Sequence, residues 1–175
     1  MSSNNRVFEE TLDIKEIDKD LKVFDKVQRC EGVYRKVLNS ISKTQDSKYK
    51  ISMDINSEIY PMKKDASYKL LLAKSIYESK PTPKHFDYEL FTNTKNTLMD
   101  NYDYVMCGKV FQFSPDKKKK DDNDPSGTLS ISISFGGLLF RISGIKRDVK
   151  TGKPNGFEDI NLDDTLYLLI KKISK

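Results

Sequence analysis

Apolar and polar residues alternate along most of this chain, and this period of two limits its fold more than any other feature. In the segment 49–60 the apolar residues occur at every second position: Tyr49, Ile51, Met53, Ile55 and Ile59. Strand side chains point alternately to two faces, so the pattern predicts a half-buried antiparallel strand that Pro61 ends. The same pattern continues over 68–76, after a turn at 63–65. Helical periodicity is scarce, and the sequence therefore predicts an all-β fold.

The clearest local prediction is a hairpin over residues 129–144. Two alternating runs flank the glycine pair Gly136-Gly137, which is typical of a two-residue type I′ turn with positive φ at both positions. Such a turn places apolar residues opposite each other, which favours this register. The expected pairs are Phe135 with Leu138, Ile133 with Phe140 and Ile131 with Ile142. One long strand bulged at the glycines is the alternative.

Four further segments bring the expected number of strands to eight. The segment 166–170 is apolar on both faces, which predicts a central or doubly covered strand. In 102–113 the parity of the apolar residues changes next to Gly108, which predicts a bulge or a barrel bend there. Partial alternation predicts weaker strands over 7–17 and 22–37. Eight strands with regular turn signals predict an all-β barrel or sandwich.

Three segments between the strands are predicted to be long surface loops, at about 78–100, 114–127 and 146–164. The first carries two prolines, the second is a low-complexity charge run, and the third is rich in turn residues. No linker or internal repeat divides the chain. Its 175 residues are therefore expected to form a single domain that buries a core of its own.

Residues suited to catalysis or metal binding are few in this sequence. It has one histidine, His85, in a loop-like segment, and two cysteines, Cys30 and Cys107. This composition excludes a disulfide scaffold, a cysteine-based zinc site and a centre with several histidines, and it argues against most hydrolase mechanisms. No apolar run could span a bilayer, and the first ten residues lack a signal peptide's apolar core. We expect no catalytic site, metal, cofactor or membrane association.

The net charge of +5 comes mainly from lysine, because 26 of the 31 basic residues are lysines. The basic excess lies between Lys26 and Lys84, while neighbouring aspartates cancel the lysine run at 117–120. Proteins that read phosphates and bases rely on the bidentate fork of arginine. This balance favours solubility and general electrostatic steering.

Two loop motifs resemble ligand sites, and neither is complete. The acidic segment 122–127 begins like a calcium loop, but its twelfth position is Ile133 where a bidentate glutamate is required. The pair Gly152-Lys153 lacks the upstream glycine of a phosphate-binding loop. The first is interpreted as a solvated turn, and the second carries no site.

Aromatic residues and one arginine give the remaining candidates. Tyr102, Tyr104, Phe111 and Phe113 could form a base-stacking platform on a barrel, although aromatic residues at period two are more often core residues. Cys107 is expected to be a small buried hydrophobe. Arg141 lies on the presumed outer face with Leu139, and an exposed apolar residue beside an arginine is a plausible interface anchor.

Several blocks of this sequence resemble the eighth subunit of the eukaryotic nuclear RNA polymerases, which enzymes I, II and III share. The blocks are YDYVMCG at 102–108, SFGGLLFR at 134–141 and YLLIKK at 167–172, with 26–29, 54–56 and 60–61 in matching order upstream. The resemblance covers about residues 8–172. The sequence departs from the family at Cys107, where a tyrosine is usual, and at Phe140, which replaces a methionine.

The resemblance implies a single eight-stranded antiparallel barrel of oligonucleotide/oligosaccharide-binding topology. It also implies a non-catalytic nuclear subunit, without metal, that docks mainly on the largest polymerase subunit and makes a smaller contact with the third-largest. Tyr102, Tyr104, Leu139 and Arg141 are the interface candidates, and Gly136 and Gly137 form the structural turn. The alternative function is a stand-alone single-stranded nucleic-acid binder on the same barrel, supported by the basic segment and the aromatic strand.

Overall fold

A computed structural model describes residues 5–18, 25–34, 49–77, 97–115, 128–146, 157 and 159–173. These residues form eight strands and one short 3₁₀ helix. The strands are β1 (Arg6–Ile17), β2 (Val27–Tyr34), β3 (Lys50–Asn56), β4 (Ser67–Ala73), β5 (Tyr104–Pro115), β6 (Thr128–Phe135), β7 (Leu138–Lys146) and β8 (Thr165–Ile173). The 3₁₀ helix, η1 (Leu98–Asn101), precedes β5.

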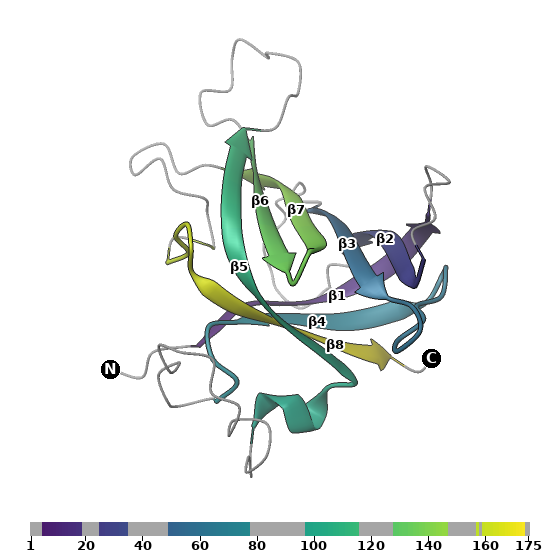
Figure 1. The fold of residues 1–175 in the computed structure, drawn as a ribbon. Coiled ribbons are helices and arrows are strands. Elements are labelled where there is room, and N and C mark those ends of the chain that lie inside the picture. Colours follow the sequence, from purple (N-terminus) through teal and green to yellow (C-terminus); the bar gives the residue numbers. More distant parts are fainter. Residues whose placement is uncertain are drawn as a thin grey trace, which may run out of the picture.

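The strands close into an antiparallel barrel in the order β1-β2-β3-β7-β6-β5-β8-β4, and β4 pairs again with β1 (Figure 1). The long, curved strand β5 makes closure possible because it changes partner along its length. Its first half, 104–109, pairs with β8, and its second half, 109–115, pairs with β6. The predicted all-β class and eight-stranded antiparallel barrel are confirmed.

The β6–β7 hairpin has the predicted register. Phe135 pairs with Leu138, Ile133 with Phe140 and Ile131 with Ile142. Both turn glycines have positive φ, +62° at Gly136 and +99° at Gly137. A Cβ at either position would meet no atom within 4 Å, so the requirement for glycine is conformational rather than steric. The alternative of one long bulged strand is wrong.

Strand β8 lies between two apolar clusters, as its sequence predicts. Leu166, Leu168 and Ile170 point into the main core inside the barrel. Tyr167 and Leu169 point outward into a second cluster, with Leu71 and Ala73 of β4 and with Ile76 and Leu98 from outside the strands. The second cluster is thus built on the outer surface of the barrel and is covered by η1 and the chain after β4.

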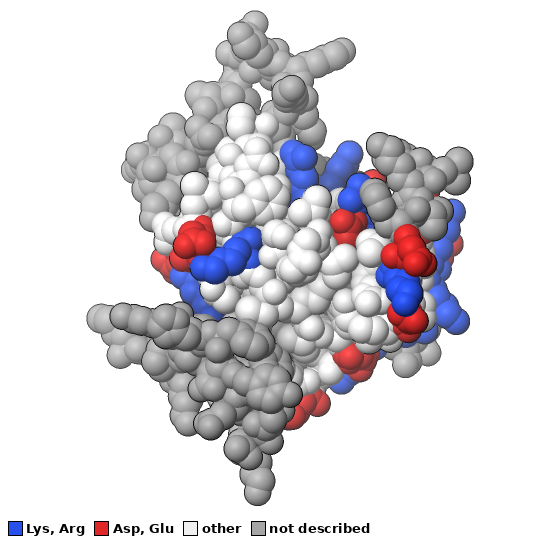
Figure 2. Space-filling view, viewed as in Figure 1, with Lys and Arg blue, Asp and Glu red and all other residues white. Residues whose placement is uncertain are grey.

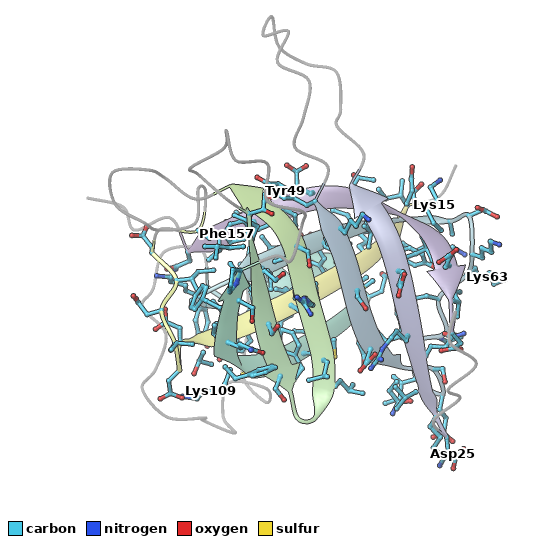
Figure 3. The ribbon with its side chains drawn as sticks, turned by 90° about the horizontal axis from the view of Figure 1, so that it is seen from above. Lys15, Asp25, Tyr49, Lys63, Lys109 and Phe157 are labelled. Atoms are coloured by element: carbon cyan, nitrogen blue, oxygen red, sulfur yellow. The ribbon has the colours of Figure 1, made fainter. Side chains whose placement is uncertain are left out.

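Aromatic rings pack together around the barrel core, and two of these groups bear on the predictions. Tyr60 and Tyr104 are stacked with ring centroids 5.2 Å apart. Away from this pair, Phe157 stacks on Phe8 and meets Tyr49 edge-on, and Figure 3 shows Tyr49 and Phe157 side by side. Phe157 and Ile160 are buried in the main core, so the prediction that 146–164 is entirely a surface loop is wrong at these residues.

The bulge in β5 lies three residues beyond its predicted position. The register with β6 shifts between Val110 and Gln112, which leaves Phe111 as the extra residue. Gly108 is regular in the ladder but has no room for a side chain, because a Cβ there would overlap the Ser134 carbonyl oxygen and the Phe135 ring. The single bulge predicted next to Gly108 thus corresponds to two separate features. Gly108 is needed because the neighbouring strand approaches its backbone closely, and the bulge itself lies at Phe111.

Other boundaries differ modestly from the prediction. Strand β3 ends at Asn56, and the Tyr60 N–H donates to the Asn56 carbonyl oxygen over 2.9 Å in the turn that follows. The predicted loop 78–100 contains η1 at its end. Ser114 and Pro115 belong to β5, and Lys146 belongs to β7. His85, the lysine run at 117–120, the acidic segment 122–127 and the pair Gly152-Lys153 lie outside the described residues.

Candidate partner interface

From residue 130 to 134 the outward residues of β6 are all serines, because its apolar residues point into the barrel. Each serine lies between one residue of β5 and one of β7: Ser134 between Lys109 and Leu139, Ser132 between Gln112 and Arg141, and Ser130 between Ser114 and Ser143. We call this outer surface of β5, β6 and β7 the serine face. At Ser132 and Ser134 the small side chains of the middle row lie lower than the longer side chains of β5 and β7 on either side.

Arg141 lies over this row and is fixed by it. Its Nη2 donates to Ser130 Oγ over 3.0 Å, and the Ser130 hydroxyl donates to Ser143 Oγ over 3.2 Å. The guanidinium is exposed, as predicted for an outward residue. Lys109, on the other side of the row, forms an exposed ion pair with Asp163 at 3.1 Å.

Exposed apolar side chains border the serine face. Leu139 is 44% exposed, Phe111 49% and Leu162 59%. The Phe111 side chain is outside the core because of the β5 bulge, and Leu162 lies in the turn whose next residue, Asp163, donates its N–H to the Val110 carbonyl oxygen. In Figure 2 the middle of the view, where β5, β6 and β7 lie in Figure 1, is largely uncharged.

A buried carboxylate holds the edge of the serine face next to β3. Asp54 accepts two hydrogen bonds from Arg29, from Nε at 2.7 Å and from Nη2 at 2.9 Å. Its Oδ2 also accepts from the Leu139 N–H at 3.3 Å. The β3–β7 ladder stops at the pair Met53–Phe140, so the Asp54 side chain bridges the two strands where their backbones cease to pair.

A groove of about 490 Å³ adjoins the serine face on the β1–β2–β3 side. Its charged lining residues are Lys15, Glu16, Glu31, Lys50 and Arg141. The lining has both signs of charge, and Glu16 and Glu31 are adjacent in the β1–β2 register. With three cations and two anions, the lining is suited to a ligand that carries both charges.

The four predicted interface residues do not lie together. Leu139 and Arg141 are on the outer face, as expected. Tyr104 packs against the main core, and its hydroxyl accepts the Asn56 N–H at 3.2 Å, so the expectation that Tyr104 points outward is wrong. Tyr102 is partly buried against the second cluster, and burial, aided by the charge of Glu9, raises its pKa to about 12. The two tyrosines have the same parity but different environments, because Tyr102 caps η1 before β5 begins and Tyr104 is the first residue of β5.

The aromatic residues of β5 and its approach do not form one surface. Tyr104 and Phe113 pack against the main core, Tyr102 belongs to the second cluster, and Phe111 is exposed. The interpretation of these rings as mainly core residues is confirmed for Tyr104 and Phe113. A continuous stacking platform made of all four is excluded by this separation.

The two cysteines have pKa values shifted away from reactivity. Burial, with the charges of Asp18 and Asp54, raises the pKa of the Cys30 thiol to about 12. Burial also raises the pKa of Cys107, which is half-buried in the second cluster beside Tyr167. Within the described residues, no group of three or more histidine, cysteine, aspartate or glutamate side chains could hold a metal ion. The same residues include no helix long and apolar enough to cross a membrane.

Sequence reasoning missed Phe111, Leu162 and the serine row as parts of one surface. The alternation of serine with leucine and isoleucine over 129–134 was used only to predict the hairpin and its register. If the change in apolar parity had been placed at Phe111 rather than next to Gly108, the sequence would have predicted an outward-pointing Phe111 ring. The position of Leu162 depends on hydrogen bonds between distant segments, which periodicity does not encode.

The whole barrel can be compared with known proteins. Residues 9–172 match the family model described as RNA polymerase Rpb8. The chain belongs to this family. The match includes every described strand except the first residues of β1 and the last residue of β8, which is consistent with the resemblance of the sequence blocks.

Individual relatives support the family assignment over nearly the full length. "DNA-directed RNA polymerases I, II, and III subunit rpabc3" of Dictyostelium discoideum is 33% identical over 166 residues, 95% of this chain and 96% of that protein. "DNA-directed RNA polymerases II, IV and V subunit 8B" of Arabidopsis thaliana is 29% identical over 174 residues, 99% of this chain and 100% of that protein. The Saccharomyces cerevisiae subunit RPABC3 is 27% identical over 175 residues, covering 97% and 99%.

Proposed function

We propose that this member of the RNA polymerase Rpb8 family is a non-catalytic structural subunit of DNA-directed RNA polymerases I, II and III. The observation that carries the proposal is the family match over residues 9–172. Relatives from Dictyostelium and Saccharomyces are named as subunits of these three enzymes, whereas the Arabidopsis relative is named for enzymes II, IV and V. The proposal includes action in the nucleus, in both nucleoplasm and nucleolus.

In this role the barrel docks mainly on the largest catalytic subunit and makes a smaller contact with the third-largest. Leu139 and Arg141 are the proposed contact residues, because both are exposed and neighbour each other on β7. Tyr102 is half-buried, so only part of its ring could reach a partner. A stable interface of this kind buries more than about 1,000 Å² and has an apolar centre.

The experiment is an affinity purification of the tagged full chain from nuclear extract, with mass spectrometry after washes at moderate and high salt. The expected result is co-purification of the large catalytic subunits of all three polymerases, retained at high salt because an apolar interface is little screened. Recovery of one polymerase alone would restrict the proposal to that enzyme. Absence of all polymerase subunits would refute it.

The alternative, a stand-alone single-strand binder, predicts a different outcome in the same purification. Nucleic acid rather than polymerase would bind, and it would be released steeply with rising salt. The inward packing of Tyr104 and Phe113 weakens this alternative, because stacking requires exposed ring faces along one groove.

A further inference from the structure

We propose that the serine face binds an extended polypeptide segment of another polymerase subunit, whose carboxylate side chain pairs with Arg141 and whose apolar side chains cover Leu139 and Phe111. The inference rests on the proposed function and deepens it by naming the surface and the chemistry of its partner. Three features of the face support it: its shape, its apolar borders and its charge.

The shape of the face suits a polypeptide backbone. Ser132 and Ser134 lie between longer residues of β5 and β7, so the surface is lower there than on its two sides. Small residues allow close approach of another backbone, and hydroxyl groups both donate and accept hydrogen bonds. Ser130 is fully buried and its hydroxyl is bonded to Arg141 and Ser143, so the low part of the row is Ser132–Ser134, about 7 Å at the rise of a strand.

Apolar anchors stand on both sides of this row. Leu139 projects from β7, and Phe111 projects from β5 because the bulge turns its ring away from the core. Bulges commonly serve to re-aim a side chain in this way. A phenylalanine and a leucine left half-exposed beside a polar row are suited to the apolar centre of a protein interface.

The charge of the face favours a carboxylate over a nucleic-acid backbone. The Arg141 guanidinium has five donors in a planar fork that matches a carboxylate, and its hydrogen bond to Ser130 fixes its orientation. A nucleic-acid strand presents phosphates in series and needs several cations along its path. Beyond Arg141 the groove carries Lys15 and Lys50 together with Glu16 and Glu31, so its charges are of mixed sign and do not form the series of cations that a nucleic-acid strand needs.

The first test is site-specific photo-crosslinking in the assembled polymerase. The photoreactive residue p-benzoylphenylalanine is introduced into the full chain as Phe111→p-benzoylphenylalanine or Leu139→p-benzoylphenylalanine, and the polymerase is purified before irradiation. Lys63→p-benzoylphenylalanine is the matched control, because Lys63 is exposed and lies on the opposite side of the barrel from Lys109 in Figure 3. The expected result is crosslinks from positions 111 and 139 to one segment of a single polymerase subunit. The control variant at position 63 should give no crosslink to that segment.

The outcomes separate this inference from the proposed function. A chain that co-purifies with polymerase but crosslinks from positions 111 and 139 to nucleic acid, to a second copy of itself or to nothing overturns the inference and leaves the proposed function intact. A chain that does not co-purify with polymerase refutes both.

The second test addresses the carboxylate. Arg141→Glu is expected to increase dissociation of the chain from purified polymerase by roughly tenfold or more during a salt wash, whereas Arg141→Lys has a smaller effect because it keeps the charge but loses the fork. Lys63→Glu provides the same charge change on the other side of the barrel and is expected to dissociate like the wild type. Equal retention of the Arg141→Glu and wild-type chains would overturn the pairing of Arg141 with a carboxylate.

Discussion

Two parts of the outer barrel surface both present apolar side chains, but only one of them is covered by the chain itself. Over β4 and β8, Leu71 and Leu169 point away from the barrel interior and are nevertheless buried, because Ile76 and Leu98 pack onto them. Over β5 and β7, Phe111 and Leu139 also point outward and stay half-exposed. The covered cluster therefore adds buried apolar surface to the fold, whereas Phe111 and Leu139 keep exposed apolar surface that we propose a partner covers.

The contrast predicts that equivalent truncations have opposite consequences on the two surfaces. Leu169→Ala should lower the free energy of unfolding by about 3 kcal/mol, because it removes a fully buried side chain and leaves a cavity between β8 and η1. Urea unfolding followed by circular dichroism measures the change, since the chain has no tryptophan. A loss as small as that of an exposed leucine would show that the second cluster is loosely packed.

Asp54 is expected to give the next largest effect, because it joins the serine face to β3. Asp54→Ala removes the partner of the Leu139 N–H and both acceptors of Arg29. The expected destabilisation is about 2 kcal/mol, less than for a fully buried pair because Arg29 is 40% exposed and regains water.

The matched control for Asp54 is Lys109→Ala, which breaks the exposed ion pair with Asp163 from the Lys109 side. Its unfolding midpoint should not change measurably, because exposed ion pairs contribute little. Similar midpoints for Asp54→Ala and Lys109→Ala would contradict the bridging role of Asp54.

Gly136 tests how firmly the hairpin orients Leu139. Gly136→Val places a β-branched residue at φ +62°, and we expect a loss of roughly 1–2 kcal/mol together with failure to assemble if the register slips. Gly136→Asn is the control, because asparagine tolerates positive φ and is common in such turns. A Gly136→Val chain that co-purifies normally with the polymerase would show that the turn is not decisive.

Local patterns carried most of the fold prediction. The register of β6 with β7 followed from the glycine pair and the apolar alternation, and the double burial of β8 followed from its unbroken apolar run. These features depend on neighbours in sequence or on one face of one strand. The bulge at Phe111 and the burial of Phe157 depend instead on how distant segments meet, so strand parity alone misplaced them.

The candidate interface was only half predictable for the same reason. Leu139 and Arg141 follow from the parity of a hairpin whose turn is fixed by glycine. Tyr104 lies before the point where β5 changes partner, and its inward direction is set by stacking on Tyr60 and by the bond from Asn56. No pattern within 102–106 specifies these contacts.

The covered cluster should respond to alkaline pH more than the serine face. Burial raises the pKa of Tyr102 and of Tyr167 to about 12, above the value of about 10 for an unfolded tyrosine. The folded chain therefore favours the neutral hydroxyl, and this stabilisation is complete below about pH 10 and is lost as the pH rises toward 12. Because Tyr102 is partly exposed and Tyr167 is buried, we expect a loss of about 1 kcal/mol for Tyr102 and about 2 kcal/mol for Tyr167.

Phenylalanine variants isolate this contribution from the titration of other groups. Tyr102→Phe and Tyr167→Phe should each lose less stability than the wild type between about pH 10 and 12 when urea midpoints are compared. Identical pH profiles for the wild type and both variants would assign the alkaline loss to groups outside the second cluster.

The smallest effect on stability is expected at Leu139. This residue gives the sharpest comparison between the serine face and the covered second cluster. Leu139→Ala should change the free energy of unfolding by less than about 0.5 kcal/mol, because the side chain is 44% exposed and its backbone N–H still donates to Asp54. Its retention on purified polymerase at high salt should nevertheless fall, because the truncation removes an apolar anchor from the proposed interface. Leu169→Ala, tested at a temperature where it remains folded, should show the reverse: reduced stability and normal retention. If both variants lost stability and retention together, the two surfaces would not be functionally distinct.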